Sequence, residues 1–275
     1  MAEKKTVLYV GCGQDHVLGK RGFDVEGWRE IRLDIDPECA PDLVGSMTDL
    51  SAVSDASMDA VYSSHTIEHL LPQDVPKALR EVARVLRPDG VLLLTCPNIQ
   101  EACRLMAEGK WKEPCYPIAE GRYHITPLDL LYGAWMMRST DKPFMSHQCG
   151  YIPSSLAAAL QTGGFASAGV MGDKWSLYAV ATRQKMEDEA LKALFMRHWS
   201  SGPSAGKEER ERERERESRF RAKRKRRMGG YANSGSQLSD GTTGRINLRK
   251  STRKTSDPHS RIGGFSYRAL STPRL

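Results

Sequence analysis

Along residues 6–183 the pattern of apolar and polar positions switches repeatedly between strand-like and helix-like segments. Short apolar runs at 6–10 and 91–95 are typical of buried strands. Residues 72–86 instead repeat their apolar side chains at the spacing of one helix face. Strands that alternate with helices are typical of an α/β fold with a largely parallel sheet. The pattern therefore predicts such a domain.

Proline and glycine mark where several of these elements end. The helix at 72–86 is expected to stop at 87–90, where the sequence reads Arg-Pro-Asp-Gly. The other expected elements are strands at 31–35, 58–63, 168–171 and 176–181 and helices at 127–137 and 153–161.

Charge divides the chain into two unequal parts. The formal net charge is +7, from 41 Lys+Arg and 34 Asp+Glu. Residues 1–185 carry 19 basic and 23 acidic residues, a net of −4, whereas residues 186–275 carry 22 and 11, a net of +11. The second part has too few apolar residues to offset chain entropy. We expect a folded domain at 1–185 and a basic, largely disordered tail at 186–275.

Several function classes conflict with the composition. No apolar run reaches the ~18–20 residues that span a bilayer, and the short run at 6–10 is not a signal peptide. The six cysteines form no CxxC pair, which favours reduced thiols and a cytoplasmic location. The basic cluster Arg221–Arg227 is a candidate nuclear-localisation or nucleic-acid segment, but it lacks interleaved aromatics, and a solvated charge run is the favoured interpretation.

A glycine turn follows the first strand directly. In Gly11-Cys12-Gly13 the backbone is free to approach a ligand closely, and a following helix start would add a favourable dipole. Asp34 ends the next strand about 20 residues on, a position suited to ribose hydroxyls. His16 stands where a dinucleotide-binding turn needs its third glycine, which disfavours a diphosphate ligand. The plainer alternative is an ordinary strand–helix turn with Asp34 as a cap.

Seven stretches, in order over residues 6–182, resemble the class I S-adenosylmethionine-dependent methyltransferases, in particular the methyltransferase type 11-like group. They are VLYVGCG (7–13), LDIDP (33–37), GSMTDL (45–50), DAVYSS (59–64), EHL (68–70), REVARVLRPDGVLLLTCPN (80–98) and GGF (163–165). The resemblance implies a Rossmann-like, mostly parallel sheet with a C-terminal antiparallel hairpin. It also implies S-adenosyl-L-methionine as cofactor and methyl transfer as the activity.

The resemblance also implies roles for individual residues. The glycine turn would line the methionine end of the cofactor, and Asp34 would hold the ribose. Asp15 and Ser46 depart from the usual pattern, at the third small residue and near the adenine amine. The implied cofactor-binding residues are Gly11, Cys12, Gly13, Asp34, Ile35, Ser46, Met47 and Ser64.

The residues after Ser64 are the candidates for catalysis, because methyl transfer needs an aligned nucleophile and, for some acceptors, a base. His65, Glu68 and His69 lie in a segment that matches the HxxEH zinc-peptidase motif, but its place after a buried strand disfavours a peptidase. We expect His65 to be the candidate general base.

A metal is the open alternative at this position. Some relatives, the ubiquinone-pathway O-methyltransferases and small-RNA 2′-O-methyltransferases, carry ExxEH here and bind a divalent ion. This chain has His65 for the first Glu, and His124 or His147 could complete a site. Because the Glu-His pair also occurs in relatives without metal, the interpretation adopted from sequence is that no metal is bound.

The irregular segment 99–150 is expected to form a substrate-binding lid with a pocket at Tyr123, His124 and His147. The acidic domain gives no reason to expect a polyanionic substrate, so a small-molecule or glycan-type acceptor is favoured. The alternatives are a nucleic-acid or protein methyltransferase recruited through the tail, and a non-catalytic cofactor-binding scaffold.

Overall fold

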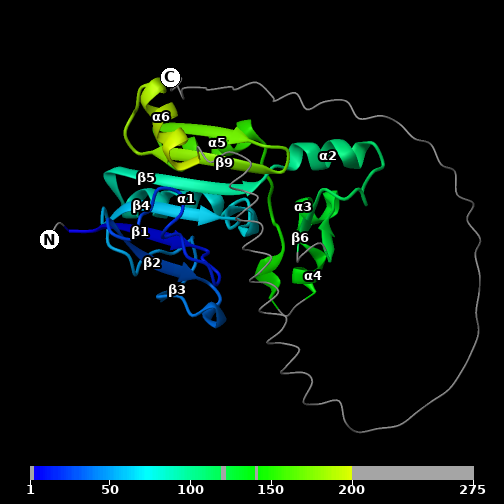
Figure 1. Cartoon of the computed structure of the whole chain (residues 1–275), viewed down its shortest axis with the longest axis horizontal. Coiled ribbons are helices and arrows are strands. Elements are labelled where there is room, and N and C mark those ends of the chain that lie inside the picture. Colours follow the sequence, from blue (N-terminus) through cyan, green and yellow to red (C-terminus); the bar gives the residue numbers. More distant parts are fainter. Residues whose placement is uncertain (1–2, 119–121, 140–141, 200–275) are drawn as a thin grey trace, which may run out of the picture.

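The computed structural model describes residues 3–118, 122–139 and 142–199, and these ranges contain one large sheet and one small one (Figure 1). The large sheet has seven strands in the order β3-β2-β1-β4-β5-β9-β8, and β6 pairs with β7 in the small one. The strands are β1 (Lys5–Val10), β2 (Trp28–Asp34), β3 (Leu43–Val44), β4 (Met58–Ser64), β5 (Leu86–Pro97), β6 (Tyr116–Ile118), β7 (Tyr123–Ile125), β8 (Ser167–Gly172) and β9 (Ser176–Thr182). The helices are α1 (Val75–Val85), α2 (Ile99–Ala107), α3 (Pro127–Tyr132), α4 (Trp135–Arg138), α5 (Pro153–Thr162) and α6 (Asp188–Trp199).

Strand direction confirms the expected fold class. Strands β1 to β5 pair in parallel, whereas β9 lies antiparallel between β5 and β8. The chain winds outward from β1 on both sides, through β2 on one side and β4 on the other. The crevice at the carboxyl ends of β1 and β4 is therefore the topological switch point, where sheets of this kind bind ligands.

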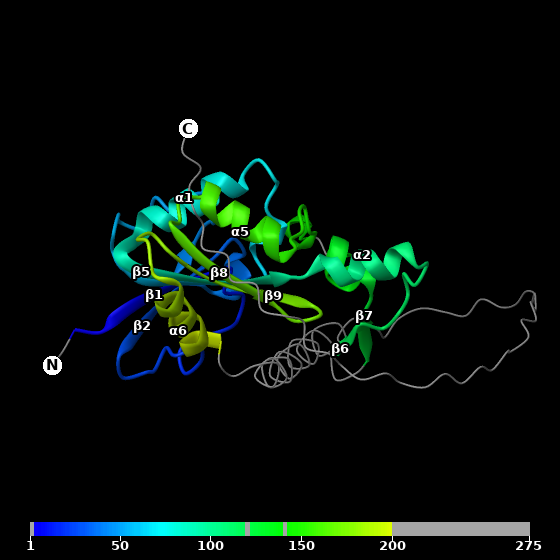
Figure 2. The same cartoon turned by 90° about the horizontal axis from the view of Figure 1, so that it is seen from above.

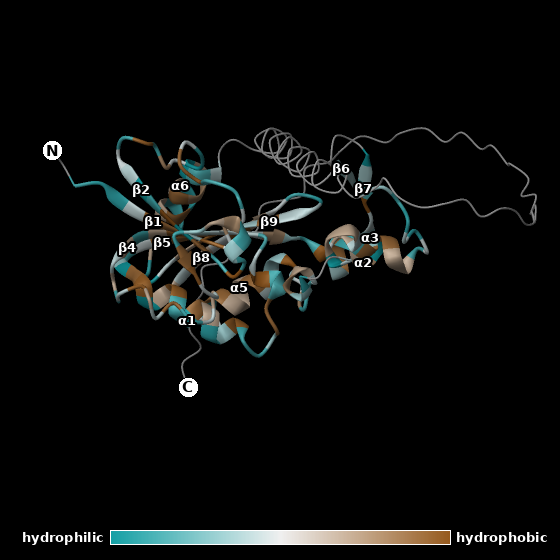
Figure 3. Cartoon of the chain, turned by 90° about the horizontal axis from the view of Figure 1, so that it is seen from below, coloured by the Kyte–Doolittle hydropathy of each residue, from teal (hydrophilic) through white to brown (hydrophobic). Residues whose placement is uncertain are grey.

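Two hydrophobic clusters lie on opposite faces of the sheet (Figures 2 and 3). On one face the buried side chains of α1 and α5, among them Leu79, Val82 and Leu156, pack against alternate strand residues. On the other face α6 supplies Leu191, Phe195 and Trp199. Because burying such side chains stabilises the fold by roughly 1.5–3 kcal/mol each, α6 is an integral layer of the domain. The folded part thus extends past the expected boundary at residue 185.

The described residues between 99 and 150 form a lobe beyond the carboxyl ends of the parallel strands (Figure 1). It contains α2, the β6–β7 hairpin, α3 and α4, and it has its own small cluster of Ala102, Ile125 and Leu130. The single helix expected at 127–137 is two short ones, because Gly133 adopts a φ of 86° between them. A Cβ there would also lie 2.8 Å from the Met145 carbonyl oxygen.

Two further details differ from the sequence predictions. No helix follows the glycine turn in the described chain, since 14–27 form turns in which Gly19 and Gly22 have positive φ. Strand β5 begins at Leu86, before the expected 91, with a register irregularity opposite Met58 to Ala60. The predicted tail beyond residue 199, including 221–227, lies outside the described residues. No helix of the described part is long and apolar enough to cross a membrane.

The contact between α6 and the 14–27 loop is predicted to contribute less to stability at acid pH. His198 is 6% exposed, its Nδ1 hydrogen-bonds the Arg21 carbonyl at 2.6 Å, and burial lowers the pKa of its ring. The folded state therefore favours the neutral ring, while the unfolded chain takes up a proton below pH ~6.5. The free energy of unfolding should fall as pH drops below that value, by at most ~1.4 kcal/mol per pH unit from this group.

Urea unfolding of the wild type and His198→Gln at pH 7.5 and 5.5 measures this. Other buried histidines contribute equally to both proteins, so the difference between the two pH dependences isolates His198. An identical pH dependence in both proteins would contradict the assignment.

Candidate functional site

The glycine turn at the end of β1 has a conformation that the two glycines make possible. Gly11 and Gly13 adopt φ values of 70° and 53°. The N–H groups of Gly11 and Cys12 both donate to the Leu33 carbonyl, at 2.8 and 3.2 Å. The Gly13 N–H donates to Asp34 Oδ2 at 2.6 Å. All three amide N–H groups of the turn therefore donate to other groups of the protein. No helix begins directly after the turn, so it offers neither free amides nor a helix N-terminus to a diphosphate. A cofactor without phosphates fits this turn.

Thr66 lies directly over Gly11, a contact that sequence reasoning missed. A Cβ on Gly11 would stand 2.1 Å from Thr66 Oγ1, so a side chain there is excluded. The Thr66 hydroxyl donates to the carbonyls of Ser64 (3.2 Å) and Val10 (3.4 Å), which ties the ends of β4 and β1 together. The one signal in the sequence was the glycine itself, because a glycine at a tight turn allows another group to approach the backbone closely.

Asp34 is 8% exposed and is held by the backbone on both sides. In addition to the Gly13 bond, its Oδ1 accepts from the Asp36 N–H at 2.9 Å. Each carboxylate oxygen keeps further acceptor capacity, so the group is oriented and still able to accept hydroxyls. Its role at the ribose stays a prediction.

The other predicted cofactor residues divide between surface and core. Ile35 is 51% exposed beside Asp34, as an adenine-facing side chain would be. Ser46 is half-buried, and its Oγ lies 2.9 Å from Thr48 Oγ1. Cys12 and Met47 point into the core, and burial raises the pKa of the Cys12 thiol to about 12. These two residues could face a cofactor only through their backbones.

Two basic residues that were not predicted, Arg32 and Lys142, connect the segments around the glycine turn and Asp36. The Arg32 guanidinium donates to the carbonyls of Gly13 (2.7 Å), Asp15 (3.1 Å) and Ala40 (3.0 Å). Lys142, from the lobe segment, bonds Asp36 and lies 2.9 Å from Glu38 Oε2. It thereby joins segments 106 residues apart across the predicted adenine side. Burial opposes the effect, but the Lys142 contact holds the pKa of Asp36 below its ordinary value.

Glu68 is the most buried charged side chain of the site, at 1% exposure. It lies in the short 3-10 helix Ile67–His69, just beyond β4. Its Oε1 is 3.2 Å from His65 Nδ1, and its backbone carbonyl accepts from the amides of Gln148 (2.8 Å) and Cys149 (3.1 Å). Burial opposes ionisation, yet His65 and two further imidazoles hold the pKa of Glu68 below its ordinary value. The residue anchors the segment that carries His147.

The predicted catalytic residues meet at this carboxylate. His65 sits at a φ of 52°, a conformation that costs a non-glycine residue of order 1–2 kcal/mol, with 46% of its side chain exposed. His69 and His147 pack edge to face, with ring centroids 4.9 Å apart. The structure brings His147, but not His124, to Glu68 and His69. His124 is exposed on β7 in the lobe. The neighbouring Tyr123 ring packs edge to face with Trp135, with ring centroids 6.2 Å apart.

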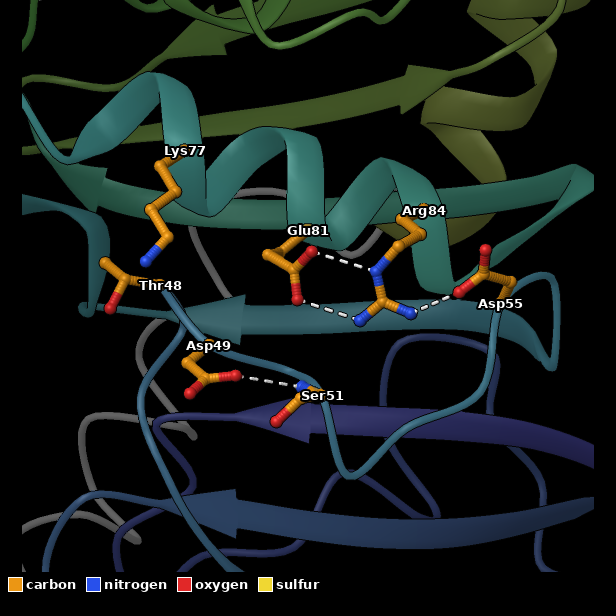
Figure 4. Close-up of a pocket in the computed structure, with 7 residues that line it drawn as sticks. All are labelled: Thr48, Asp49, Ser51, Asp55, Lys77, Glu81 and Arg84. Atoms are coloured by element: carbon orange, nitrogen blue, oxygen red, sulfur yellow. Dashed lines mark hydrogen bonds and ion pairs between the residues drawn. The ribbon is translucent and has the colours of Figure 1, made fainter.

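A separate polar depression lies between residues 48–55 and α1 (Figure 4). Arg84 there bonds both Glu81 and Asp55, and Asp49 accepts from the Ser51 amide at 3.1 Å. The Arg84–Asp55 pair joins the loop to the helix. The residues that line the depression include none of the predicted catalytic residues, and we assign it no chemistry.

Comparison with known proteins agrees with this geometry. Residues 8–94 match the family model described as a methyltransferase domain. That range begins in β1 and ends in β5, so it contains the glycine turn, Asp34 and the Glu68 helix. No curated protein matches the sequence significantly.

Some solved structures are similar to this chain at low identity. A chain from the complex of the Haloferax volcanii Trm112 methyltransferase activator with a methyltransferase is 17% identical, with a TM-score of 0.45, over 66% of this chain and 83% of that one. The PH0226 protein of Pyrococcus horikoshii gives the same values. The Burkholderia thailandensis 1,6-didemethyltoxoflavin-N1-methyltransferase, solved with 1,6-didemethyltoxoflavin and S-adenosylhomocysteine, is 15% identical (TM-score 0.43; 66% and 72% covered). At these identities no substrate or partner follows.

The glycine turn yields a direct stability prediction. Gly11→Ala should destabilise the protein more than Gly13→Ala, because only Gly11 combines a positive φ with a clash, whereas nothing lies within 4 Å of a Cβ on Gly13. We expect ~1 kcal/mol for Gly13→Ala and at least ~1–3 kcal/mol more for Gly11→Ala. Urea unfolding measures both, and Thr66→Ala added to Gly11→Ala should recover the clash contribution alone. Equal losses in the two single variants would refute the Thr66 contact.

The predicted ribose site is tested at Asp34. Asp34→Ala should weaken binding of S-adenosylmethionine by ~1.5–3 kcal/mol, the value of lost charge-assisted hydrogen bonds. Asp34→Asn keeps the shape and serves as the matched variant, with a smaller loss. Calorimetry gives both affinities, and unchanged affinity in both folded variants would show that the ribose binds elsewhere.

Proposed function

Because residues 8–94 match a methyltransferase-domain model, we propose that the chain is a class I S-adenosylmethionine-dependent methyltransferase and that it methylates a small-molecule or glycan-type acceptor bound between the switch point and the 99–150 lobe. The cofactor fits the described residues: a turn without spare amides, an oriented Asp34 carboxylate and an exposed Ile35. Bound there, S-adenosylmethionine supplies an electrophilic methyl group on a sulfonium leaving group.

The His65–Glu68 pair is the observation that carries the proposal. Glu68 is buried and contacts the Nδ1 side of the ring, while 46% of the His65 side chain is exposed. A buried carboxylate that orients an exposed imidazole is the arrangement of a general base. His65 Nε2 would take the proton of an acceptor hydroxyl or amine as the O–C or N–C bond to the methyl group forms and the methyl–sulfur bond breaks, with its electron pair remaining on the sulfur of the thioether product. Glu68 would stabilise the resulting imidazolium.

The lobe supports an acceptor of modest size. Trp135 and Tyr132 on α4 and α3 are 57% and 53% exposed, which is unusual for side chains of this size and suits a ring or sugar face. The acidic balance of residues 1–185 offers no general attraction for a polyanion. The described part of the chain therefore favours a small acceptor over a nucleic acid.

The test uses the full chain and methyl-labelled S-adenosylmethionine. Pools of small phenols, hydroxy acids, amines and glycans are compared with RNA, DNA and protein as acceptors. We expect label in a small acceptor, and unchanged transfer when the six basic residues of 221–227 are changed to glutamine. Label found only in polymer, and lost in that variant, would replace the proposal with tail-recruited polymer methylation.

His65 is tested in the same assay. His65→Asn should lower kcat by about 10²–10⁴-fold, as for loss of a general base, while cofactor affinity stays within a few-fold. Full activity of His65→Asn at every pH from 6 to 9 would remove His65 from the mechanism without touching the choice of acceptor.

A further inference from the structure

Two adjacent side chains, Glu68 and His69, meet a third, His147, that comes from a distant part of the chain. One carboxylate oxygen of Glu68 and one ring nitrogen each of His69 and His147 lie within 4.8 Å of one another. We call these three residues the Glu68 cluster. Glu68 and His69 come from the 3-10 helix after β4, and His147 from the segment that Glu68 anchors through its backbone carbonyl.

The backbone fixes the tautomer of both histidines. His69 Nδ1 lies 3.2 Å from the Ser146 carbonyl oxygen, and His147 Nδ1 lies 3.1 Å from that of Leu130. A carbonyl oxygen only accepts, so each Nδ1 carries the proton and each Nε2 keeps a lone pair. Histidines that bind metals are oriented in this way, with the second nitrogen donating to a carbonyl or carboxylate.

Glu68 supplies the charge. Its Oε1 faces His65, whereas Oε2 is buried and has no hydrogen-bond partner among the residues that the structure describes. An unpartnered buried carboxylate oxygen is unfavourable, because it has lost its hydration without gaining a hydrogen bond. A cation held between this oxygen and the imidazoles would remove that cost.

The donor set selects the kind of cation. Two neutral imidazoles and one carboxylate suit Zn²⁺ and similar first-row ions, while Mg²⁺ prefers an all-oxygen shell. Three protein ligands also leave a coordination position open, as in catalytic rather than structural zinc sites. The nearby thiol of Cys149 hydrogen-bonds the Ile67 carbonyl at 3.4 Å, and burial raises its pKa, so it is not needed as a ligand.

We propose that the Glu68 cluster binds one divalent first-row transition ion, of the Zn²⁺ or Co²⁺ type and not Mg²⁺. This departs from the metal-free interpretation of the sequence. The ion would place a Lewis acid beside the acceptor site and so extend the proposed function. Only this catalytic role of the ion rests on the proposed function. Binding itself requires neither acceptor nor turnover.

The experiment measures metal binding by the chelator-treated full chain. Zn²⁺, Co²⁺ and Mg²⁺ are titrated separately, metal per chain is determined by elemental analysis, and bound Co²⁺ is followed by its visible absorption. We expect one Zn²⁺ or Co²⁺ per chain, a low-coordinate Co²⁺ spectrum, and no displacement by millimolar Mg²⁺. Binding of Mg²⁺ in preference to Zn²⁺, or no binding of any ion, would overturn the proposal.

Substitutions localise the site. His147→Gln and Glu68→Gln should each weaken Co²⁺ binding by at least about 100-fold, more than loss of a typical outer-shell partner. His124→Gln is the matched control and should bind as the wild type does. Affinity for S-adenosylmethionine, measured on the same samples, shows that each variant is folded. Equal Co²⁺ binding by His147→Gln and His124→Gln would place the ion elsewhere and refute the assignment, whatever the acceptor is.

Discussion

A buried carboxylate at the end of β4 sets the arrangement of the whole site. Glu68 is 1% exposed, yet it contacts His65 through its side chain and holds Gln148 and Cys149 through its backbone carbonyl. Removing such a group from water is favourable only when its neighbours compensate for the lost hydration. The neighbours are three histidines, and they include one that lies 79 positions further along the chain. The segment that carries His147 thus compensates part of the cost of burying Glu68, and this contact joins the lobe to the end of β4.

Around Glu68, a small number of contacts replaces the helix that is missing after the glycine turn in the described chain. One face of the sheet is covered by α1 and α5, whereas the other has no helix between β1 and β2 in the described chain and relies on α6. The glycine turn compensates with internal bonds to Leu33 and Asp34 instead of a helix start. Arg32 and Lys142 then close the rim with backbone and carboxylate contacts. The predicted cofactor site and the fold therefore depend on the same few interactions.

The sequence predicted what local patterning determines. Strand β1, helix α1 and the hairpin β8–β9 followed from apolar periodicity, and the resemblance to methyltransferases placed Asp34 and Glu68 at the strand ends. Patterning could not reveal contacts between distant segments, such as Thr66 over Gly11 or Lys142 on Asp36, because each depends on how elements pack. It also overestimated helix at 127–137, where the positive φ of Gly133 breaks the segment, and after the glycine turn. His147 was named as a candidate, but nothing local distinguished it from His124.

We expect S-adenosylmethionine to bind at the carboxyl ends of β1 and β4. Calorimetric titration of the full chain with S-adenosylmethionine, S-adenosylhomocysteine and NAD measures this binding. We expect one site per chain for the first two ligands, with comparable affinity, and no heat from NAD, because its diphosphate finds no unused amide in the glycine turn. Binding of NAD with no heat from either S-adenosyl compound would rule out a cofactor without phosphates at this turn.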